Sequence, residues 1–416
     1  MRHFRSIFTL ALSIIAINSF AQSKLIPFKP VKSSFWGFVD EKGAIVIPAV
    51  YSKFQDFSEG YASVMDAKGK YMIIDASGAP LSVPFEKFEI PSIAGINLDR
   101  FKDGLMNVIV SKKFATINKQ GKIVHEAIYD KISEYSNGFA IGNIGEVFYL
   151  LNADGSKKQL TEPMMEVRDF KEGFAPYRAK NGQFGFIDSK GEIVIKATFE
   201  SVGYFVDGAA WAKTMEKTVG FIDTKGTWII QPSYLAAKEF DKETGYALVK
   251  NVAGWQFINK KNELLSVSGV STYGEFNEGL AYARLGEKVG FINNKGAWVI
   301  DAKYVKVENF KNGFANVKTE AGWGLIDKTG KVILETSYQG VSDVHESIFS
   351  YKQNGFWGFM TTDGKIITDA KFSAIRDFSN GYAAVRIGEL WGLIDASGKL
   401  VINAQFDRLQ DVLIVK

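Results

Sequence analysis

Short apolar runs separated by turn residues fill almost the whole chain. Residues 314–318 alternate apolar or small side chains with polar ones, which predicts a half-buried β-strand. After a turn at 320–322, residues 323–327 form a second run that is rich in aromatic and branched side chains. The loop at 328–330 ends in glycine, which suits the left-handed position of a hairpin turn, and residues 331–334 return as a third strand. The pattern therefore predicts a three-stranded β-unit.

This unit recurs along the chain at a nearly constant interval. Turn glycines, with Asn262 in place of one of them, mark eleven units, and every interval but one is 34 to 36 residues. A second landmark, the pattern Phe-x-x-Gly-x-Ala, keeps the same phase. A fixed period of this size is typical of stacked supersecondary units. The clearest copies of the hairpin combine an aromatic residue, a glycine, an aspartate and a turn glycine: Trp36, Gly37, Asp40 and Gly43; Phe184, Gly185, Asp188 and Gly191; Trp323, Gly324, Asp327 and Gly330; Trp391, Gly392, Asp395 and Gly398; and, without the aspartate, Trp357 and Gly358.

The number of units bears on their arrangement. Eleven units exceed the range of about four to eight blades that is usual for a β-propeller, and three strands are one fewer than a usual blade. We therefore expect an all-β tandem array that forms an open, twisted β-repeat superhelix. Propeller-like rings, including two rings in tandem, are the alternative. The apolar residues 412–415 are a candidate for a strand that closes the array.

The glycine of each Trp-Gly pair needs an explanation of its own. A glycine inside a strand commonly marks the close approach of another group. We expect this group to be an aromatic ring of the adjoining unit, of the class of Tyr338 or Phe310, so that stacked units share one core.

The chain divides into a leader and the array. Residues 1–21 combine early arginines, an apolar run and small residues before a cleavage point near Ala21, as in a secretory signal peptide. We expect export to the periplasm, the cell surface or the medium. Residues 22–34 are predicted to be an extended lead-in, and residues 35–416 the array. The one long interval places an insertion at 79–100, whose prolines indicate a projecting loop.

Composition excludes several classes of function. The formal net charge is only +4, and lysines alternate with glutamates, so the sequence predicts no nucleic-acid partner. Cysteine is absent, which excludes thiol catalysis and disulfide bonds. No segment after the leader is apolar for long enough to be a transmembrane helix. Long amphipathic helices are not predicted either.

The repeated motif resembles the WG-containing repeat family of bacterial, often exported proteins. The resemblance covers residues 35–416; it is specific where Trp-Gly is present and looser where Phe184, Val219 or Val289 replaces the tryptophan. It implies a β-repeat scaffold and an exported protein. It transfers no catalytic residue.

The repeated aspartates are the first candidates for chemistry. A row of carboxylates could bind calcium, but one carboxylate in each unit lacks the dense ligand spacing of a calcium loop. Asparagine takes the same place at Asn118, Asn259 and Asn293. This exchange favours a turn in which the side chain accepts hydrogen bonds from backbone N–H groups. We therefore expect no metal site here.

Aromatic side chains and histidines are the remaining candidates. Motif tryptophans at a strict period are expected to be core residues, although a ladder that stacks on sugars or a peptide is the alternative. Trp228 and Trp298 lie in the third strand, where an exposed binding ring is conceivable. His125 and His345 stand alone in their units and are expected at the surface or in turns. The sequence contains neither a phosphate-binding glycine loop nor a Gly-x-Ser-x-Gly elbow.

These observations favour a binding function. We expect a non-catalytic scaffold, without cofactor or metal, that holds a protein or peptide partner through its variable surfaces and the insertion. Recognition of a glycan or envelope polysaccharide by exposed aromatics is the alternative. A third possibility is a hydrolase, which would need two carboxylates that converge in a cleft and break the repeat pattern.

Overall fold

The computed structural model describes residues 23–91 and 100–415, and within them the chain is all β, as the sequence predicts. The predicted signal peptide lies outside the described residues, as do residues 92–99 of the insertion. No helix in the described part is long and apolar enough to cross a membrane. The strands form ten antiparallel sheets, and the largest contains two adjoining units, so the described residues make up eleven units.

A regular unit has four strands, of which the sequence predicts three. In unit 9 these are β28 (Lys306–Val307), β29 (Phe314–Thr319), β30 (Gly322–Asp327) and β31 (Val332–Tyr338), paired in this order. The added strand, β28, comes from the connector that precedes the hairpin. It is only two residues long, which is too short to leave an alternating pattern in the sequence.

The other units are variations on this arrangement. Unit 1 contains β40 (Arg408–Leu409), β1 (Ser23–Lys29), β2 (Trp36–Val39) and β3 (Ile45–Phe54), with β41 (Leu413–Val415) beside β1; unit 2 contains the end of β3, β4 (Tyr61–Asp66) and β5 (Tyr71–Asp75); unit 3 contains β6 (Leu105–Val110), β7 (Lys113–Asn118) and β8 (Ile123–Tyr129); unit 4 contains β9 (Lys131–Ile132), β10 (Phe139–Ile144), β11 (Val147–Asn152) and β12 (Lys157–Gln159). Unit 5 contains β13 (Met164–Val167), β14 (Phe174–Ala179), β15 (Phe184–Asp188) and β16 (Ile193–Phe199); unit 6 contains β17 (Ser201–Val202), β18 (Ala209–Lys213), β19 (Val219–Asp223) and β20 (Trp228–Tyr234); unit 7 contains β21 (Ala236–Phe240), β22 (Tyr246–Asn251) and β23 (Gly254–Asn259); unit 8 contains β24 (Val270–Tyr273), β25 (Leu280–Leu285), β26 (Lys288–Asn293) and β27 (Trp298–Tyr304). Unit 10 contains β32 (Gly340–Val341), β33 (Ile348–Gln353), β34 (Phe356–Thr361) and β35 (Ile366–Phe372), and unit 11 contains β36 (Ala374–Ile375), β37 (Tyr382–Ile387), β38 (Leu390–Asp395) and β39 (Leu400–Phe406).

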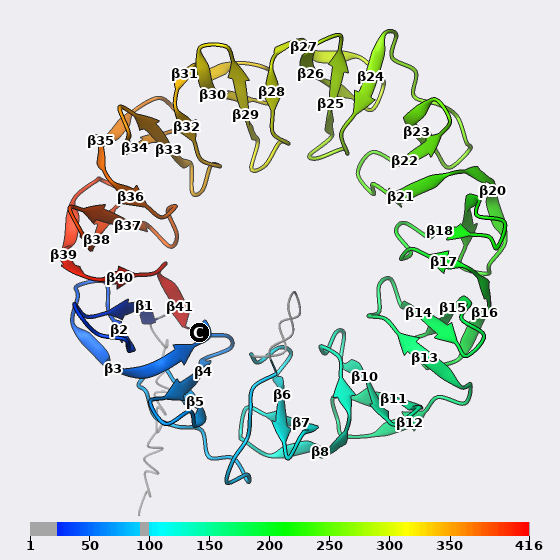
Figure 1. Cartoon of the computed structure of the whole chain (residues 1–416), viewed down its shortest axis with the longest axis horizontal. Helices are drawn as coiled ribbons and strands as arrows, with labels where there is room; N and C mark the ends of the chain where they lie inside the picture. Colours follow the sequence, from blue (N-terminus) through cyan, green and yellow to red (C-terminus); the bar gives the residue numbers. More distant parts are fainter. Residues whose placement is uncertain (1–22, 92–99, 416) are drawn as a thin grey trace, which may run out of the picture.

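The units form one closed ring rather than an open superhelix (Figure 1). The N-terminal strand β1 pairs with β2 on one edge and with the C-terminal strands β40 and β41 on the other. The open arrangement that the sequence favoured is therefore corrected to the propeller-like alternative, as a single ring rather than two. The reason is that unit 1 is completed by strands from both ends of the chain. It follows that the predicted lead-in is itself a strand of the array, and that residues 413–415 close it as expected.

Neighbouring units bury their faces against each other. In β29, Ala315, Asn316 and Val317 are all at most 4% exposed, so both faces of the strand are covered and the predicted half-buried strand is wrong. Val317 packs in one cluster with Tyr304 of unit 8, which shows that the core consists of layers between units. The buried amide of Asn316 donates to Glu308 Oε2 at 3.1 Å, so its Nδ2 group is satisfied.

The motif glycine is covered by backbone rather than by an aromatic ring of the next unit. A Cβ on Gly324 would lie 2.5 Å from the carbonyl oxygen of Leu334 and 2.9 Å from the carbonyl carbon of Glu335. These atoms belong to β31 of the same unit, which bulges where the register jumps between Trp323↔Tyr338 and Leu325↔Leu334. The expected ring contact is thus corrected: glycine is needed because the bulged third strand crosses directly over it.

The described part of the insertion packs against the ring instead of projecting from it. Leu81, Val83, Phe85 and Phe88 cover a cluster of buried residues that includes Ile73 of unit 2. Two backbone contacts hold the segment in place: Leu81 N–H donates to the Ile73 carbonyl at 2.7 Å, and Glu89 pairs with Ile109 of β6. The prediction of a projecting loop is therefore wrong for residues 79–91, because their apolar side chains have a core to join.

Candidate binding surface

The repeated aspartates shape the hairpin turns. Asp327 Oδ1 accepts hydrogen bonds from the backbone N–H groups of Thr329 at 2.8 Å and Lys331 at 3.1 Å. Within the described residues, no group of three or more histidine, aspartate or glutamate side chains is arranged to hold a metal ion. The carboxylates thus serve as turn acceptors, the arrangement that the turn interpretation predicts. The same pair of bonds occurs at Asp40, Asp75, Asp188, Asp223, Asp395, Asn118, Asn259 and Asn293.

The tryptophans are engaged by their neighbours. Trp323 is half-buried, and the ammonium groups of Lys306 and Lys318 lie 5.2 and 5.6 Å from the centre of its ring. Trp228 is half-buried and meets the ring of Phe199 edge to face at 5.6 Å. Trp298 is half-buried against the core between units 7 and 8. Each of the three rings is thus partly covered by neighbouring side chains.

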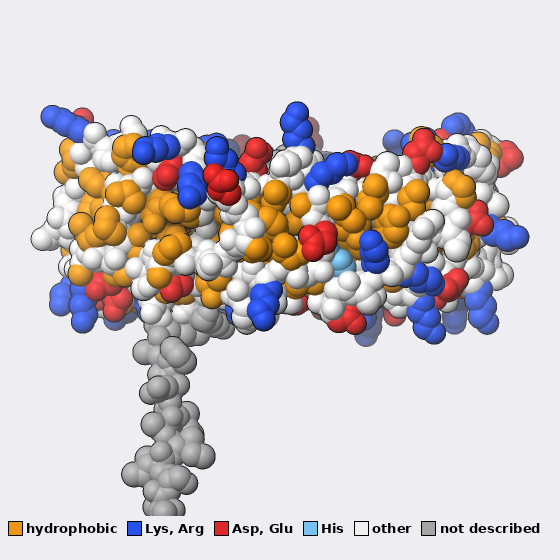
Figure 2. Space-filling view, turned by 90° about the horizontal axis from the view of Figure 1, so that it is seen from below, with side chains coloured by type: hydrophobic (Ala, Val, Ile, Leu, Met, Phe, Trp, Pro, Cys, Tyr) orange, Lys and Arg blue, Asp and Glu red, His pale blue; other side chains and the backbone are white. Residues whose placement is uncertain are grey.

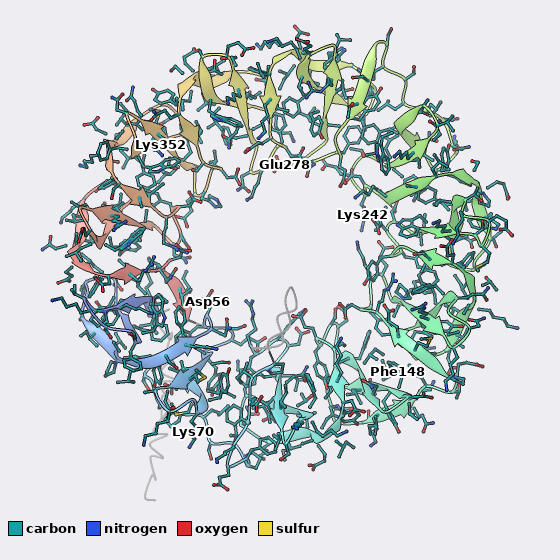
Figure 3. The ribbon with its side chains drawn as sticks, in the orientation of Figure 1. Asp56, Lys70, Phe148, Lys242, Glu278 and Lys352 are labelled. Carbon is teal, nitrogen blue, oxygen red and sulfur yellow. The ribbon has the colours of Figure 1, made fainter. Side chains whose placement is uncertain are left out.

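Glutamates on the inner rim, which the sequence did not single out, join consecutive units. Figure 3 shows Glu278 at the central opening, and its Oε2 accepts a hydrogen bond from Gly313 N–H of the next unit at 2.9 Å. Glu346 accepts two such bonds, from Asn380 N–H at 2.6 Å and Gly381 N–H at 2.8 Å. Each glutamate is the first residue of a two-residue turn, with a left-handed φ of 51° for Glu278 and 53° for Glu346. For Glu278 the signal in the sequence is the acidic or amide residue that precedes the glycine of the Phe-x-x-Gly pattern. Glu346 occupies the same place in a unit where valine and serine replace the phenylalanine and the glycine, so this signal is absent there.

The two histidines differ in their surroundings. His125 is 3% exposed and its Nε2 lies 2.9 Å from the Asn152 carbonyl oxygen of unit 4, so the expected surface or turn position is wrong. Burial lowers the pKa of His125, partly opposed by the bond to this carbonyl. The cause is its place in the third strand, where other units carry a buried aliphatic residue such as Ile195 or Ile300. His345 is half-buried, with Nε2 3.8 Å from Asp377 Oδ2.

The outer rim carries a band of apolar side chains between two charged edges (Figure 2). Exposed aliphatic residues recur at the second position of the third strand, as in Val194, Ile229 and Val299. Because they repeat from unit to unit, they follow from the repeat itself and do not distinguish one unit from another.

The clearest departure from the repeat is a cleft beside the insertion. In regular units the residue at the tryptophan position pairs with the aromatic residue that ends the third strand, as Trp323 does with Tyr338. Tyr71 holds this position in unit 2, but there the described segment after the turn pairs with β5 only near Ile74 and Pro80. The chain then leaves the sheet, and a cleft of about 640 Å³ opens between Tyr71 and residues 86–89.

The charged side chains that line this insertion cleft are exposed, whereas the apolar ones are half-buried; we call the first its walls and the second its floor. Lys68, Lys70 and Lys87 line it, together with Glu86 and Glu89. Among the described residues, none of these three lysines has a carboxylate partner within ion-pair distance. The apolar part of the lining comes from Tyr71, Phe88 and Ile109.

A second cleft, of about 430 Å³, lies between units 4 and 5. Its charges are used within the protein: Arg168 Nε donates to Glu166 at 3.0 Å and its Nη1 donates to the Val202 carbonyl at 3.1 Å. Two further carboxylates, Glu134 and Asp169, line it, and burial, followed by the charge of Glu134, raises the pKa of Asp169. Both lie directly before the aromatic residue that opens the Phe-x-x-Gly-x-Ala landmark, a position that recurs from unit to unit. The pair therefore follows the repeat, whereas the hydrolase hypothesis requires two carboxylates that break it.

Comparison with known proteins agrees with the repeat pattern. The sequence of the chain matches the family model of the WG containing repeat in eight segments: residues 36–71, 116–141, 184–217, 220–251, 290–321, 323–355, 357–391 and 391–412. No curated protein matches the sequence significantly.

Several solved structures are similar over most of the chain at low identity. A eukaryotic initiation factor is 12% identical, with 84% of this chain and 95% of that chain covered and a TM-score of 0.42. The computationally designed protein Ika8 is 10% identical, with 64% and 93% covered and a TM-score of 0.31. PorZ, a bacterial surface component of the type-IX secretion system of Porphyromonas gingivalis, is 12% identical, with 91% and 66% covered and a TM-score of 0.25.

Proposed function

Because the chain belongs to the WG containing repeat family and its units close into one ring, we propose that it is a non-catalytic scaffold that binds a protein or peptide partner. The N-terminal sequence supports export, so the partner is proposed to lie in the periplasm, at the cell surface or in the medium. The fold of a repeat scaffold does not by itself identify its binding site. We place recognition of the partner where the structure departs from the repeat pattern.

The observation that carries this proposal is the insertion cleft. Its volume of about 640 Å³ falls within the range of about 300–1,000 Å³ that is usual for ligand sites, and it combines an apolar floor with charged walls. Its two sides are fixed, because Glu89 is paired with Ile109 and Leu81 with Ile73. A preformed cleft of this kind binds a partner without the cost of ordering a loop.

The state of the tryptophans favours a protein or peptide over a glycan. A sugar ring is bound by stacking on an open aromatic face, whereas Trp228 meets Phe199 and Trp323 has two lysine ammonium groups near its ring. The alternative, a glycan ligand, would have to compete with these contacts or use the smaller aromatic residues of the clefts.

A capture experiment tests the proposal. The mature chain, residues 22–416, is immobilised, exposed to an envelope extract, and the captured proteins are identified by mass spectrometry. Each is then titrated in purified form against the chain by calorimetry. We expect a saturable complex with at least one protein or peptide. Absence of saturable protein binding, together with saturable tryptophan quenching by a polysaccharide, would overturn the proposal in favour of the glycan alternative.

A further inference from the structure

We propose that the insertion cleft binds its partner by strand addition: an extended, acidic peptide segment pairs with the free edge of β5 at Tyr71. This inference rests on the proposed function and names the partner's chemistry and its mode of binding. It draws on three independent features of the cleft: the free backbone edge, the apolar floor and the lysines.

Among the described residues, no backbone group pairs with Tyr71 on the side turned away from β4. The β4–β5 hairpin is closed by the bond from Asp66 N–H to the Lys70 carbonyl at 3.0 Å. Antiparallel hydrogen bonds alternate from one residue pair to the next, so the pair Met65↔Tyr71 is not bonded and Tyr71 turns its N–H and C=O away from β4. Within the described residues, β5 pairs on that side only through the bridge from Ile74 to Pro80 and the bond from Leu81 to Ile73.

Other units show what this edge is built to receive. In unit 9 the same position, Trp323, pairs with Tyr338 of the third strand. In unit 2 the third strand is diverted into the insertion. Among the described residues no strand therefore pairs with Tyr71, although Tyr71 has the same place in its hairpin as Trp323. A free donor and acceptor on a sheet edge is the template on which peptides add as an extra strand.

The diverted segment keeps the position beside Tyr71 open. Glu89 takes the place of the short first strand of unit 3, because it pairs with Ile109 just as Lys306 pairs with Lys318 in unit 9. Phe88 is held against the buried cluster below it. The insertion therefore cannot fold back onto β5 without leaving its own core.

The lining of the cleft decides which side chains the added strand carries. Tyr71, Phe88 and Ile109 offer apolar surface to alternate residues of an extended segment. Lys68, Lys70 and Lys87 offer ammonium groups at the walls. Asp66 Oδ1 accepts hydrogen bonds from Lys70 N–H at 2.9 Å and Lys68 N–H at 2.8 Å, and these bonds, followed by the charges of the two lysines, lower the pKa of Asp66. Among the described residues, however, Asp66 forms no ion pair with either ammonium group.

Charge complementarity therefore points to an acidic segment with apolar residues in alternation. Glu86 and Glu89 are also at the wall, and they would repel a segment that is acidic at every position. Acidic residues are thus expected on one face of the added strand only, with valine-like or aromatic residues on the other.

Synthetic peptides of about ten residues test the idea by fluorescence anisotropy. The probes are an alternating Glu-Val peptide, an alternating Lys-Val peptide, and the Glu-Val peptide with N-methyl groups along one edge, which removes the donors that strand addition needs. We expect the acidic probe to bind about tenfold or more tightly than the basic probe, and N-methylation to weaken it about tenfold. Equal binding of the acidic and basic probes, or indifference to N-methylation, would overturn the proposal.

Charge-reversal variants show where the probe binds. The triple variant Lys68→Glu, Lys70→Glu, Lys87→Glu is expected to bind the acidic probe about tenfold more weakly. A control that also reverses surface charge, Lys328→Glu with Lys331→Glu on the exposed turn of unit 9, is expected to bind as the wild type does. Circular dichroism and thermal melting check that both variants stay folded; all five lysines are exposed.

The captured partner separates this inference from the proposed function. A natural partner that binds the triple variant as well as the wild type overturns the insertion cleft as the site, while the scaffold function stands. A chain that captures no partner, yet binds the acidic probe with the expected selectivity, keeps the cleft assignment and refutes the scaffold proposal in that extract.

Discussion

Replacing Gly324 by alanine tests whether the bulged third strand dictates the glycine of the motif. The added Cβ would lie 2.5 Å from the Leu334 carbonyl oxygen and 2.9 Å from the Glu335 carbonyl carbon. Both atoms are backbone, so they cannot rotate away as the end of a side chain can. The strand β31 has to move by roughly half an ångström, which disturbs the ladder at the bulge.

The expected magnitude follows from these contacts. Overpacking of a core costs about 1–3 kcal/mol, and a displaced ladder hydrogen bond adds about 1 kcal/mol. Alanine also reduces the freedom of the unfolded chain, which offsets about 0.5–1 kcal/mol. Together these contributions predict that the free energy of unfolding falls by about 1–3.5 kcal/mol.

Urea unfolding, followed by tryptophan fluorescence, measures this loss as a shift of the midpoint at constant slope. The matched control is Gly340→Ala, where the new Cβ would meet the Trp357 ring at an ordinary 3.4 Å. It should leave the free energy of unfolding within about 0.5 kcal/mol of the wild type. If Gly324→Ala is equally mild, the bulge does not require glycine and our explanation of the motif is refuted.

Three further predictions concern the rim, the closure of the ring and its pH dependence. Glu346→Ala removes the acceptor of two backbone N–H groups of the next unit and should lower the free energy of unfolding by about 1–3 kcal/mol in urea titrations, whereas an effect below about 0.5 kcal/mol would deny the contact a structural role. The variant Lys24→Cys with Ile414→Cys, at facing positions of β1 and β41, should form a disulfide seen as a shift on non-reducing gels, and the melting temperature should rise; an open array would leave both thiols reactive. Burial lowers the folded-state pKa of His125 below its unfolded value of about 6.5. The stability that the neutral side chain contributes is therefore present above about pH 6.5 and is lost as the pH falls from there through the folded-state pKa. His125→Ile should flatten the fall in melting temperature between about pH 7.5 and 5.5, and an unchanged fall would contradict this assignment.

The sequence was sufficient for the unit but not for the ring. Period and turn chemistry predict the hairpin of Trp323 and the role of Asp327, because both depend on contacts a few residues apart. Closure depends on the angle between successive units and on the pairing of β1 with β40 and β41, which no local pattern encodes. A count of eleven units therefore favoured the open array, although one ring holds them all.

Long-range packing also explains the errors at single residues. His125 looked like an isolated polar side chain, yet it fills a slot that is aliphatic in other units and reaches the Asn152 carbonyl of the next unit. The insertion was located by its long interval, but a diverted third strand cannot be told from a projecting loop by proline content. The free edge at Tyr71 became visible only by comparison with a regular unit such as that of Trp323 and Tyr338.

The position of β5 links the proposed binding site to the closure of the ring. One sheet runs in the order β40, β1, β2, β3, β4, β5, so the closing pairs lie at one end and the free edge at the other. A ligand strand on β5 would extend the sheet that holds the two ends of the chain together. Anything that binds only the closed form stabilises it by mass action, so the acidic probe should raise the melting temperature of the wild type and of Glu346→Ala. A probe that binds tightly but leaves both melting temperatures unchanged would show that its site is independent of the closed ring.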